Sequence, residues 1–280
     1  MLSVENAETQ TFTEVKSHYS SLNLAKRIAA ALEAAGFEAD APLFPEQLAP
    51  LDQFHTRGAE ATLEIAQMAG IQPDDAVLDV GSGLGGPARL IANVCGCHVT
   101  GIDLSEPFVE AAQYLTARTL QQSHVQFQSA NALQLPFADG AFDITLNQHV
   151  AMNIGDRAGL YSELRRVTRA GGKLALHDVV LGSGDPHYPL PWAKTHAESF
   201  LLNAPNTIET VERCGFKRDQ VRDDTESAKA WFTALRNAGP PLILNLGLAM
   251  GTEMRQYAEN LGRSIMEGKV RILSATFIAV

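Results

Sequence analysis

Short apolar segments alternate with amphipathic segments over the middle of the chain. Apolar residues cluster in brief runs, such as AVLDV at 76–80, and between these runs they recur at every third or fourth position. The first pattern is typical of buried strands and the second of helices with one apolar face. Strands that alternate with helices indicate a parallel sheet covered by helices on both faces. Strands are expected at 76–80, 98–102, 125–128, 142–147 and 173–178, and helices at 87–94, 107–118 and 157–168.

The segments on either side of this region are mainly helical. Apolar spacing predicts helices at 22–35 and 56–69, which end at glycines, and glycine readily adopts the left-handed conformation that ends a helix. The proline-rich stretch 40–50 predicts a loop. Further on we expect a loop at 182–193, a helix at 200–214, a strand at 221–225, helices within 228–268 broken at 239–241, and a strand at 271–280. The pattern predicts an α/β fold with a Rossmann-like, seven-stranded, mostly parallel sheet, an N-terminal helical extension and a helical insertion before the last strand.

The sequence VLDVGSGLGG at 77–86 places several glycines where an expected strand meets an expected helix. Glycines let the backbone turn tightly and approach a nucleotide without a side chain in the way. The loop fits the G-x-G-x-x-G pattern of dinucleotide-binding folds, and Asp103 ends the next strand, where an acid binds ribose hydroxyls. An NAD-dependent oxidoreductase is therefore one interpretation. Asp79 argues against it, because a carboxylate there gives no advantage in binding a pyrophosphate at a helix N-terminus.

Several motifs in order resemble those of class I S-adenosylmethionine-dependent methyltransferases. The glycine loop is followed by GIDLS at 101–105, LPF at 135–137, DGAFD at 139–143 and RRVTRAGG at 165–172. The general likeness is to sarcosine/dimethylglycine-type and ubiquinone/sterol-type small-molecule methyltransferases. The resemblance implies S-adenosyl-L-methionine as cofactor. It also implies an N-terminal helical lid at 1–70, a cofactor-binding core at 71–180, and an acceptor-side helical insertion with the final strands at 181–280, in one compact catalytic domain.

The resemblance assigns cofactor contacts to residues of the matching motifs. Asp79 would face the amino or sulfonium end of the cofactor, and Asp103 would accept hydrogen bonds from both ribose hydroxyls. Leu104 would pack on the adenine. Asn131 stands where many relatives have an acidic residue that meets the adenine amino group. The predicted cofactor-binding residues are Asp79, Gly81, Gly83, Gly85, Asp103, Leu104, Asn131, Ala132, Gln148 and His55, the last in a His-x-x-Gly element that would help to cover the cofactor.

The acceptor side is less defined by the sequence. Methyl transfer from a sulfonium depends mainly on proximity and orientation; a neutral amine needs little further help, whereas a phenol or a carbon acid needs a base. The candidate catalytic residues are His149 after the fourth expected strand, His177 in the fifth, and Tyr19 near the N-terminus. Packing in the core is the alternative role for each. We expect methylation of a small molecule, first at an amine nitrogen, with carbon or oxygen methylation of an apolar or phenolic metabolite as the alternative.

Charge, apolar runs and cysteine content limit the binding partners and the cellular location that we expect. The chain has 22 basic and 32 acidic residues, a net charge of −10, which argues against nucleic acid as a substrate because phosphate contacts need clustered basic residues. The N-terminus has no apolar run typical of a signal peptide, and no run has the ~18 apolar residues of a membrane span. The three cysteines fit neither a disulfide framework nor a metal site. We therefore expect a cytoplasmic protein without metal or membrane partner; its oligomeric state stays open, a dimer included.

Overall fold

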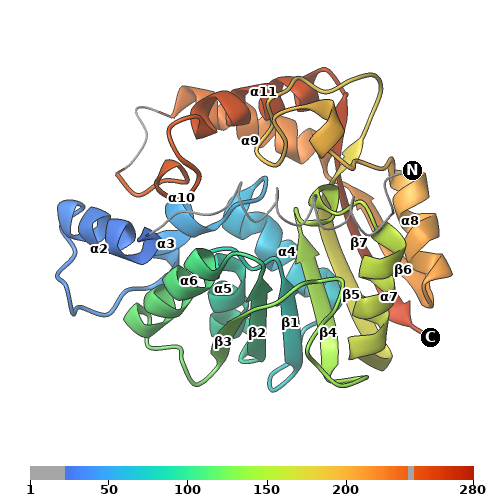
Figure 1. The fold of residues 1–280 in the computed structure, drawn as a ribbon, viewed down its shortest axis with the longest axis horizontal. Coiled ribbons are helices and arrows are strands. Elements are labelled where there is room, and N and C mark those ends of the chain that lie inside the picture. The colour runs from blue at the N-terminus through green and yellow to red at the C-terminus, as the bar shows by residue number, and fades with distance from the viewer. Residues whose placement is uncertain (1–22, 239–242) are drawn as a thin grey trace, which may run out of the picture.

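The computed structural model of the chain describes residues 23–238 and 243–280 (Figure 1). A seven-stranded sheet runs through its centre in the order β3-β2-β1-β4-β5-β7-β6. Neighbouring strands from β3 to β5 are parallel, and β7 is antiparallel to β5 and β6. The predicted seven-stranded, mostly parallel α/β sheet is therefore confirmed. The strands are β1 (Ala76–Val80), β2 (His98–Asp103), β3 (Val125–Ser129), β4 (Phe142–Gln148), β5 (Thr168–Leu181), β6 (Phe216–Asp223) and β7 (Val270–Ala279).

Helices cover both faces of this sheet. One face packs against α4 (Gly58–Ala69), α5 (Gly86–Cys95) and α6 (Glu106–Arg118), whose buried aliphatic side chains form one core cluster with those of β1 to β5. The other face packs against α7 (Arg157–Val167) and α8 (Ala204–Arg213) in a second cluster. The apolar positions of these helices face the sheet, as the periodicity of the segments predicts, and the first seven residues of α5 are all buried.

The remaining helices lie beyond the carboxyl ends of the parallel strands. Near the N-terminus these are α2 (Leu24–Ala34) and α3 (Pro45–Asp52), and towards the C-terminus α9 (Thr225–Asn237), α10 (Gly247–Met250) and α11 (Met254–Met266). Figure 1 shows α9 and α11 above the upper end of the sheet. Buried side chains of α2, α3, α6 and α10 form one cluster, so the two additions to the sheet meet each other. They enclose the edge at which parallel α/β sheets bind their ligands.

Three elements differ from the sequence expectation, the first being β5, which spans Thr168–Leu181 where a strand was expected at 173–178. The proline-rich segment 40–50 contains the start of α3, because Pro45 occupies the first helical turn and the Gln47 side chain accepts a hydrogen bond from the Phe44 backbone N–H at 2.8 Å; proline is compatible with that position. Strand β6 begins at Phe216 instead of residue 221. Its sequence FKRDQVRD is mostly exposed at the sheet edge, where charged residues are common, so it lacks an apolar pattern. The predicted helix break at 239–241 lies outside the described residues.

A buried ion pair fixes the chain segment that leads into the N-terminal side of the site. Arg89 of α5 has a fully buried side chain and donates hydrogen bonds to Asp52 Oδ2 at 2.7 Å and to the Leu84 carbonyl at 2.7 Å. Its other amino group donates to the Thr116 hydroxyl at 3.1 Å. Asp52 ends α3, and the polypeptide continues directly into residues 53–56 of the site. The pair therefore sets where this segment leaves α3.

Two of the three cysteines flank the end of α5. Cys95 ends α5, Gly96 follows in the left-handed conformation with φ of 72°, and Cys97 is buried. All three cysteines are free thiols, as expected. Over residues 23–238 and 243–280, no helix is both long enough and apolar enough to cross a membrane.

Candidate active site

A cavity of about 950 Å³ lies at the carboxyl ends of β1, β2 and β4. The glycine loop after β1 and the loops after β2 and β3 form one half of its wall. Residues 52–56 and the turn after β4 lie between this half and a second one, formed by residues 191–200 and side chains of α9 to α11. The cavity therefore joins the expected cofactor side to the expected acceptor side.

The glycine loop curves closely around the first half. Gly81 has a φ of 70°, and a Cβ atom built on it would come within 2.4 Å of Val150. Gly83 has a φ of 52°, and its backbone N–H donates to Asp103 Oδ2 at 3.0 Å. Positive φ values favour glycine, so both positions require it. Gly85, by contrast, does not line the cavity: it precedes α5, and a Cβ atom there would meet the ring of Phe127 at 2.3 Å. The structure gives this glycine a packing role.

Two carboxyl groups line this half of the cavity. Asp103 accepts a hydrogen bond at each oxygen, from the backbone N–H of Gly83 and from that of Ser105 at 2.9 Å. Asp79 is buried, and its Oδ2 has no hydrogen-bond partner among the described residues. Burial, and secondarily the negative charge of Asp103, raises the pKa of Asp79 to about 7. A buried carboxyl group without a partner is costly, so this site favours a ligand that brings a cation to Asp79.

The two amide side chains at the cavity differ in whether their oxygen atom already accepts a hydrogen bond. Gln148 ends β4 and donates to the Thr62 hydroxyl at 3.3 Å, and its Oε1 has no partner among the residues that the structure describes. Asn131 uses its carbonyl oxygen to accept from the Leu133 backbone N–H at 3.0 Å. Its acceptor is therefore already engaged within its own turn. Leu104 and Ala132 line the same half of the cavity.

Three histidines meet between the two halves. The ring centres of His55, His149 and His177 lie 5.3 to 6.0 Å apart. His149 follows β4 directly with a φ of 53°, a left-handed conformation that is uncommon for a residue with a side chain and that clusters at functional sites. Burial lowers the pKa of His55 to about 3 and that of His177 to about 4, and it lowers the pKa of His149 well below 6.5. All three rings are therefore neutral at pH 7.

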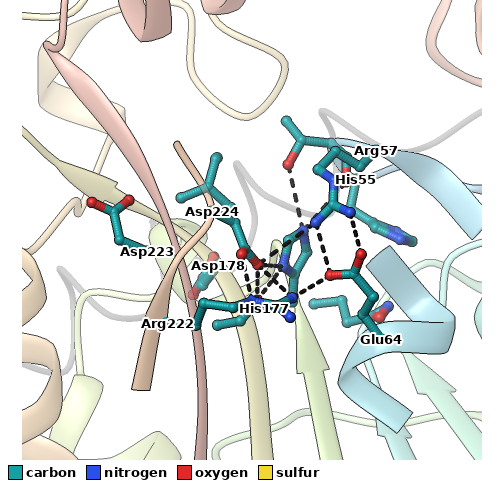
Figure 2. A network of polar contacts seen from close by, with 12 residues as sticks. His55, Arg57, Glu64, His177, Asp178, Arg222, Asp223 and Asp224 are labelled. Carbon is teal, nitrogen blue, oxygen red and sulfur yellow. Dashed lines mark hydrogen bonds and ion pairs between the residues drawn. The ribbon is translucent and has the colours of Figure 1, made fainter. Parts of the chain in front are cut away.

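The three histidines have different hydrogen-bond partners: His55 contacts the loop before α4, and His149 and His177 contact hydroxyl groups. His55 Nε2 lies 2.9 Å from the Gly58 carbonyl oxygen, within the loop that leads into α4. His149 Nε2 lies 3.2 Å from the Thr56 hydroxyl, and His177 Nδ1 lies 2.8 Å from the Ser274 hydroxyl on β7. Figure 2 shows that His177 points towards Asp224 and the charged groups around it. His177 is fully buried and does not line the cavity.

The acceptor half is almost entirely apolar. Trp192 is buried and donates its indole N–H to the Ser199 hydroxyl at 3.0 Å, and Trp231 packs edge-to-face on Phe232 with 4.9 Å between ring centres. Trp192 and Trp231 thus give this half of the cavity an aromatic wall. Over residues 23–238 and 243–280, the one carboxylate that lines this half is Asp156, which caps α7 by accepting from the Gly159 backbone N–H at 2.7 Å. The other lining residues here include Met152, Ile154, Phe200, Leu235, Met250, Met254 and Leu261.

Most predicted site residues therefore come together. All predicted cofactor-binding residues except Gly85 line the cavity, as does His149. Tyr19 lies outside the described residues. Sequence reasoning missed Thr56, Ser274 and Asp224, which connect to the histidines only through tertiary contacts. Among the described residues, no group of histidine, cysteine and acidic side chains has the arrangement of a metal site.

Comparison with known proteins identifies the family. A methyltransferase domain family matches residues 78–176. The O-methyltransferase resE of Aspergillus sclerotiorum is 37% identical over 188 residues, which cover 63% of this chain and 70% of that protein. The chain belongs to the S-adenosylmethionine-dependent methyltransferases. The resemblance seen in the sequence motifs is confirmed, and the oxidoreductase alternative is excluded.

One further sequence relative and one solved structure are also similar to this methyltransferase. Sterol 24-C-methyltransferase ERG6B of Gibberella zeae is 34% identical over 114 residues, covering 41% of this chain and 30% of that protein. The solved geranyl diphosphate C-methyltransferase of Streptomyces coelicolor A3(2) has the same fold, with a TM-score of 0.70 at 17% identity, covering 96% of this chain and 98% of the other. The protein is thus an enzyme that uses S-adenosyl-L-methionine to methylate small molecules, and these relatives differ in the atom that they methylate.

Proposed function

We propose that this enzyme transfers a methyl group from S-adenosylmethionine to a hydroxyl oxygen of an apolar small molecule. The observation that carries the proposal is the boundary between the two halves of the cavity. A neutral histidine, His149, lies there, beside an acceptor half lined by aromatic and aliphatic side chains. The relative resE is itself an O-methyltransferase.

The polar groups of the first half fit the cofactor. Asp103 keeps acceptor capacity on both oxygens beyond its two backbone hydrogen bonds and would bind the two ribose hydroxyls. Asp79 would pair with the amino group of the methionine portion, which would supply the partner that its Oδ2 lacks. The unpaired Oε1 of Gln148 would accept from the same portion. Leu104 and Ala132 would enclose the adenine, with Gly81 and Gly83 beneath the sulfonium side.

Oxygen is favoured over nitrogen by the charges of the cavity. An amine acceptor is cationic near neutral pH and needs a carboxylate or a built cation site before it reacts. The free carboxyl groups that line the cavity, Asp79 and Asp103, belong to the proposed cofactor half. In the acceptor half, the Asp156 carboxylate is engaged as a helix cap. The amine nitrogen expected from the sequence therefore receives no support from this lining.

Methylation of a hydroxyl oxygen requires one group of this chain to accept the hydroxyl proton. Bound S-adenosylmethionine supplies a methyl group already activated on a sulfonium. A hydroxyl oxygen must lose its proton as it bonds to carbon, and general bases contribute typically 10²- to 10⁴-fold to such steps. His149 Nδ1 has no hydrogen-bond partner among the described residues, while Nε2 is engaged by Thr56. The free nitrogen of His149 would accept the proton, and the apolar wall would exclude water and hold the acceptor in line.

We also propose that the domain roles expected from the sequence hold. Phe54, His55 and Thr56 line the cavity, and their segment is fixed through Asp52 to α5, which suits a cover over the cofactor. Side chains of α9, α10 and α11 line the acceptor half, which suits the acceptor-side insertion. The core at 71–180 supplies the glycine loop and both free carboxyl groups.

Matched acceptors test the proposed atom. A library in which each carbon skeleton occurs as a hydroxyl compound, an amine and the parent hydrocarbon is incubated with the enzyme and trideuteromethyl-labelled S-adenosylmethionine. We expect labelled products from apolar hydroxyl compounds and none from the amines of the same skeletons. Labelled products from amines alone would overturn the proposal.

A further inference from the structure

A continuous line of polar contacts leads from the cavity across β5 and β7 to Asp224, on the face of the sheet that α4 covers. It begins at His149, passes through the Thr56 hydroxyl at 3.2 Å to His177 Nε2 at 3.5 Å, and continues from His177 Nδ1 to the Ser274 hydroxyl at 2.8 Å. Ser274 donates to Asp224 Oδ2 at 2.6 Å. The five side chains come from five separate segments, and all except His149 are buried.

The end of this line fixes the direction of its hydrogen bonds. The single proton of the Ser274 hydroxyl is donated to the Asp224 carboxylate, so the Ser274 oxygen accepts from His177, which must carry its proton on Nδ1. His177 Nε2 is then an acceptor for the Thr56 hydroxyl. Thr56 in turn accepts from Nε2 of His149. Each group donates towards Asp224, and His149 Nδ1 is left with a lone pair for the cavity. These tautomers are inferred from the hydrogen-bond network, because the partners of a ring nitrogen indicate whether it carries a proton.

Two groups near His177 partly offset the burial that lowers its pKa to about 4, and both would stabilise a second proton on the ring. Its Nε2 lies 3.3 Å from the Thr56 carbonyl oxygen, which can only accept, and its Nδ1 lies 4.0 Å from Asp224 Oδ2. Asp224 is held by Arg222 at 2.5 Å and faces Arg57 at 3.8 Å. Glu64 pairs with both arginines, so these four side chains balance in charge (Figure 2). The other titratable neighbours of His177 are the neutral His55 and His149.

We propose that Thr56, His177, Ser274 and Asp224 form a relay that keeps His149 in its Nε2–H tautomer and carries the acceptor's proton from His149 to His177. The relay rests on the proposed function, because only an acceptor that loses a proton needs it. Its members act through His149 and are positioning residues. In this arrangement His149 remains a neutral base next to the reacting oxygen while the positive charge moves towards Asp224.

The atoms balance in the methyl-transfer step, and the proton then returns from His177 through Thr56 and His149 to the cavity before the next turnover. The hydroxyl oxygen forms a bond to the methyl carbon as the carbon–sulfur bond breaks, and the electron pair of that bond stays on sulfur. The hydroxyl proton goes to His149 Nδ1. His149 passes its Nε2 proton to Thr56, and Thr56 passes its own to His177 Nε2. His177 then carries two protons, donated to Ser274 and to the carbonyl oxygen of Thr56. No oxidant, reductant or further reactant is needed.

The protonated nitrogen of each histidine ring tests the relay in the absence of a methyl acceptor. Nitrogen-15 spectra are recorded at pH 7 on the full chain, labelled at histidine and bound to S-adenosylhomocysteine, with His177 assigned through His177→Gln. We expect His177 to be protonated on Nδ1 and His149 on Nε2. Ser274→Ala should move the His177 proton to Nε2, where the Thr56 carbonyl accepts it. Thr276→Val is the matched control, since Thr276 is a buried hydroxyl on the same strand that donates to Asp219 at 3.1 Å. A His177 ring protonated on Nε2 in the unaltered protein, or unmoved by Ser274→Ala, would overturn the proposal.

Turnover provides the second readout, with the hydroxyl acceptor that the matched library identifies. Ser274→Ala should lower kcat about tenfold or more, a part of the ~10²–10⁴ contributed by a base, and should leave the acceptor KM and the Kd for S-adenosylmethionine unchanged. Thr56→Val should behave alike, and Thr56→Ser should restore kcat. Thr276→Val should match the unaltered enzyme. Equal kcat in Ser274→Ala and Thr276→Val would contradict the relay. Methylation of amines alone would contradict the proposed function, while the tautomers would still decide the hydrogen-bond order.

Discussion

The Asp103 carboxylate accepts one backbone hydrogen bond at each oxygen and faces the cavity. Two further charge-assisted hydrogen bonds, from ribose hydroxyls, are worth about 1.5–3 kcal/mol once water exchange is counted. Asp103→Ala should therefore weaken the binding of S-adenosylmethionine about 10- to 150-fold, measured by isothermal titration. The exposed Asp185 provides the control, and Asp185→Ala should bind normally. Unchanged affinity of Asp103→Ala would remove this residue from the cofactor site.

Asp79 predicts a pH dependence of cofactor binding. Its pKa is raised to about 7 by burial and by Asp103, so without ligand it is largely protonated below pH 7. Pairing with an ammonium group requires the carboxylate, and binding must then release one proton. Affinity should consequently fall as pH decreases below about 7, approaching about tenfold per pH unit. Titrations between pH 5.5 and 8 check this. In Asp79→Asn this dependence should be lost, and a flat profile in the unaltered enzyme would speak against the pairing.

His149 predicts a second pH dependence, in turnover. As a base it is active when neutral, and burial lowers its pKa well below 6.5, so kcat should stay level near neutrality and fall only in more acidic solution. His149→Ala should lower kcat about 10²- to 10⁴-fold and abolish this acidic limb, with cofactor affinity nearly unchanged. A lower melting temperature with intact turnover would show that His149 only packs.

The residues that sequence reasoning found and those that it missed differ in a physical way. The glycine loop and Asp103 are readable because they follow strands, whose carboxyl ends meet at one edge of a parallel sheet. Thr56 and His177 lie 121 positions apart and His177 and Ser274 lie 97 apart. A single hydroxyl within a helix entrance or a buried strand carries no local signal of such a partner. Only the folded sheet brings these groups together.

At the scale of elements, the attachment of α3 to α5 depends on the pair of Asp52 and Arg89. Removal of one partner of a buried pair leaves an uncompensated charge and costs about 3–5 kcal/mol. Asp52→Ala should lower the free energy of unfolding by about this amount, measured by denaturant titration. Glu259→Ala breaks an exposed pair with Arg255 and should cost at most ~0.5 kcal/mol. Similar values for both variants would show that α3 is held by its apolar contacts alone.

The elements that the sequence predicts least well are those whose role is set by their neighbours. Most strands and helices of the sheet were predicted because burial on one or both faces imposes a clear apolar period. β6 pairs only with β7 and is largely exposed, so its residues are free to be charged. α3 is short, and its prolines at 45 and 50 resemble those of a loop. Its leucines become buried in a cluster that also holds side chains of α2, α6 and α10.

At the scale of the whole molecule, one cavity joins a polar half to an apolar half, with the histidines between them. The loops after β1, β2 and β3 line the polar half, and Phe54, His55 and Thr56 also line the cavity. The fold and the cofactor follow from the family. The apolar half is lined by side chains of α9, α10 and α11 together with residues after β4 and after β5, and this convergence could not be predicted from their sequence pattern.

The atom that receives the methyl group tests this account most directly. The enzyme is supplied with S-adenosylmethionine labelled with carbon-13 in its methyl group and with the acceptor that gives the highest turnover, and the product is examined by NMR. We predict that the labelled carbon is bonded to oxygen, and that His149→Ala forms this product at least about a hundredfold more slowly. A labelled methyl group on nitrogen, formed equally fast without His149, would contradict the account.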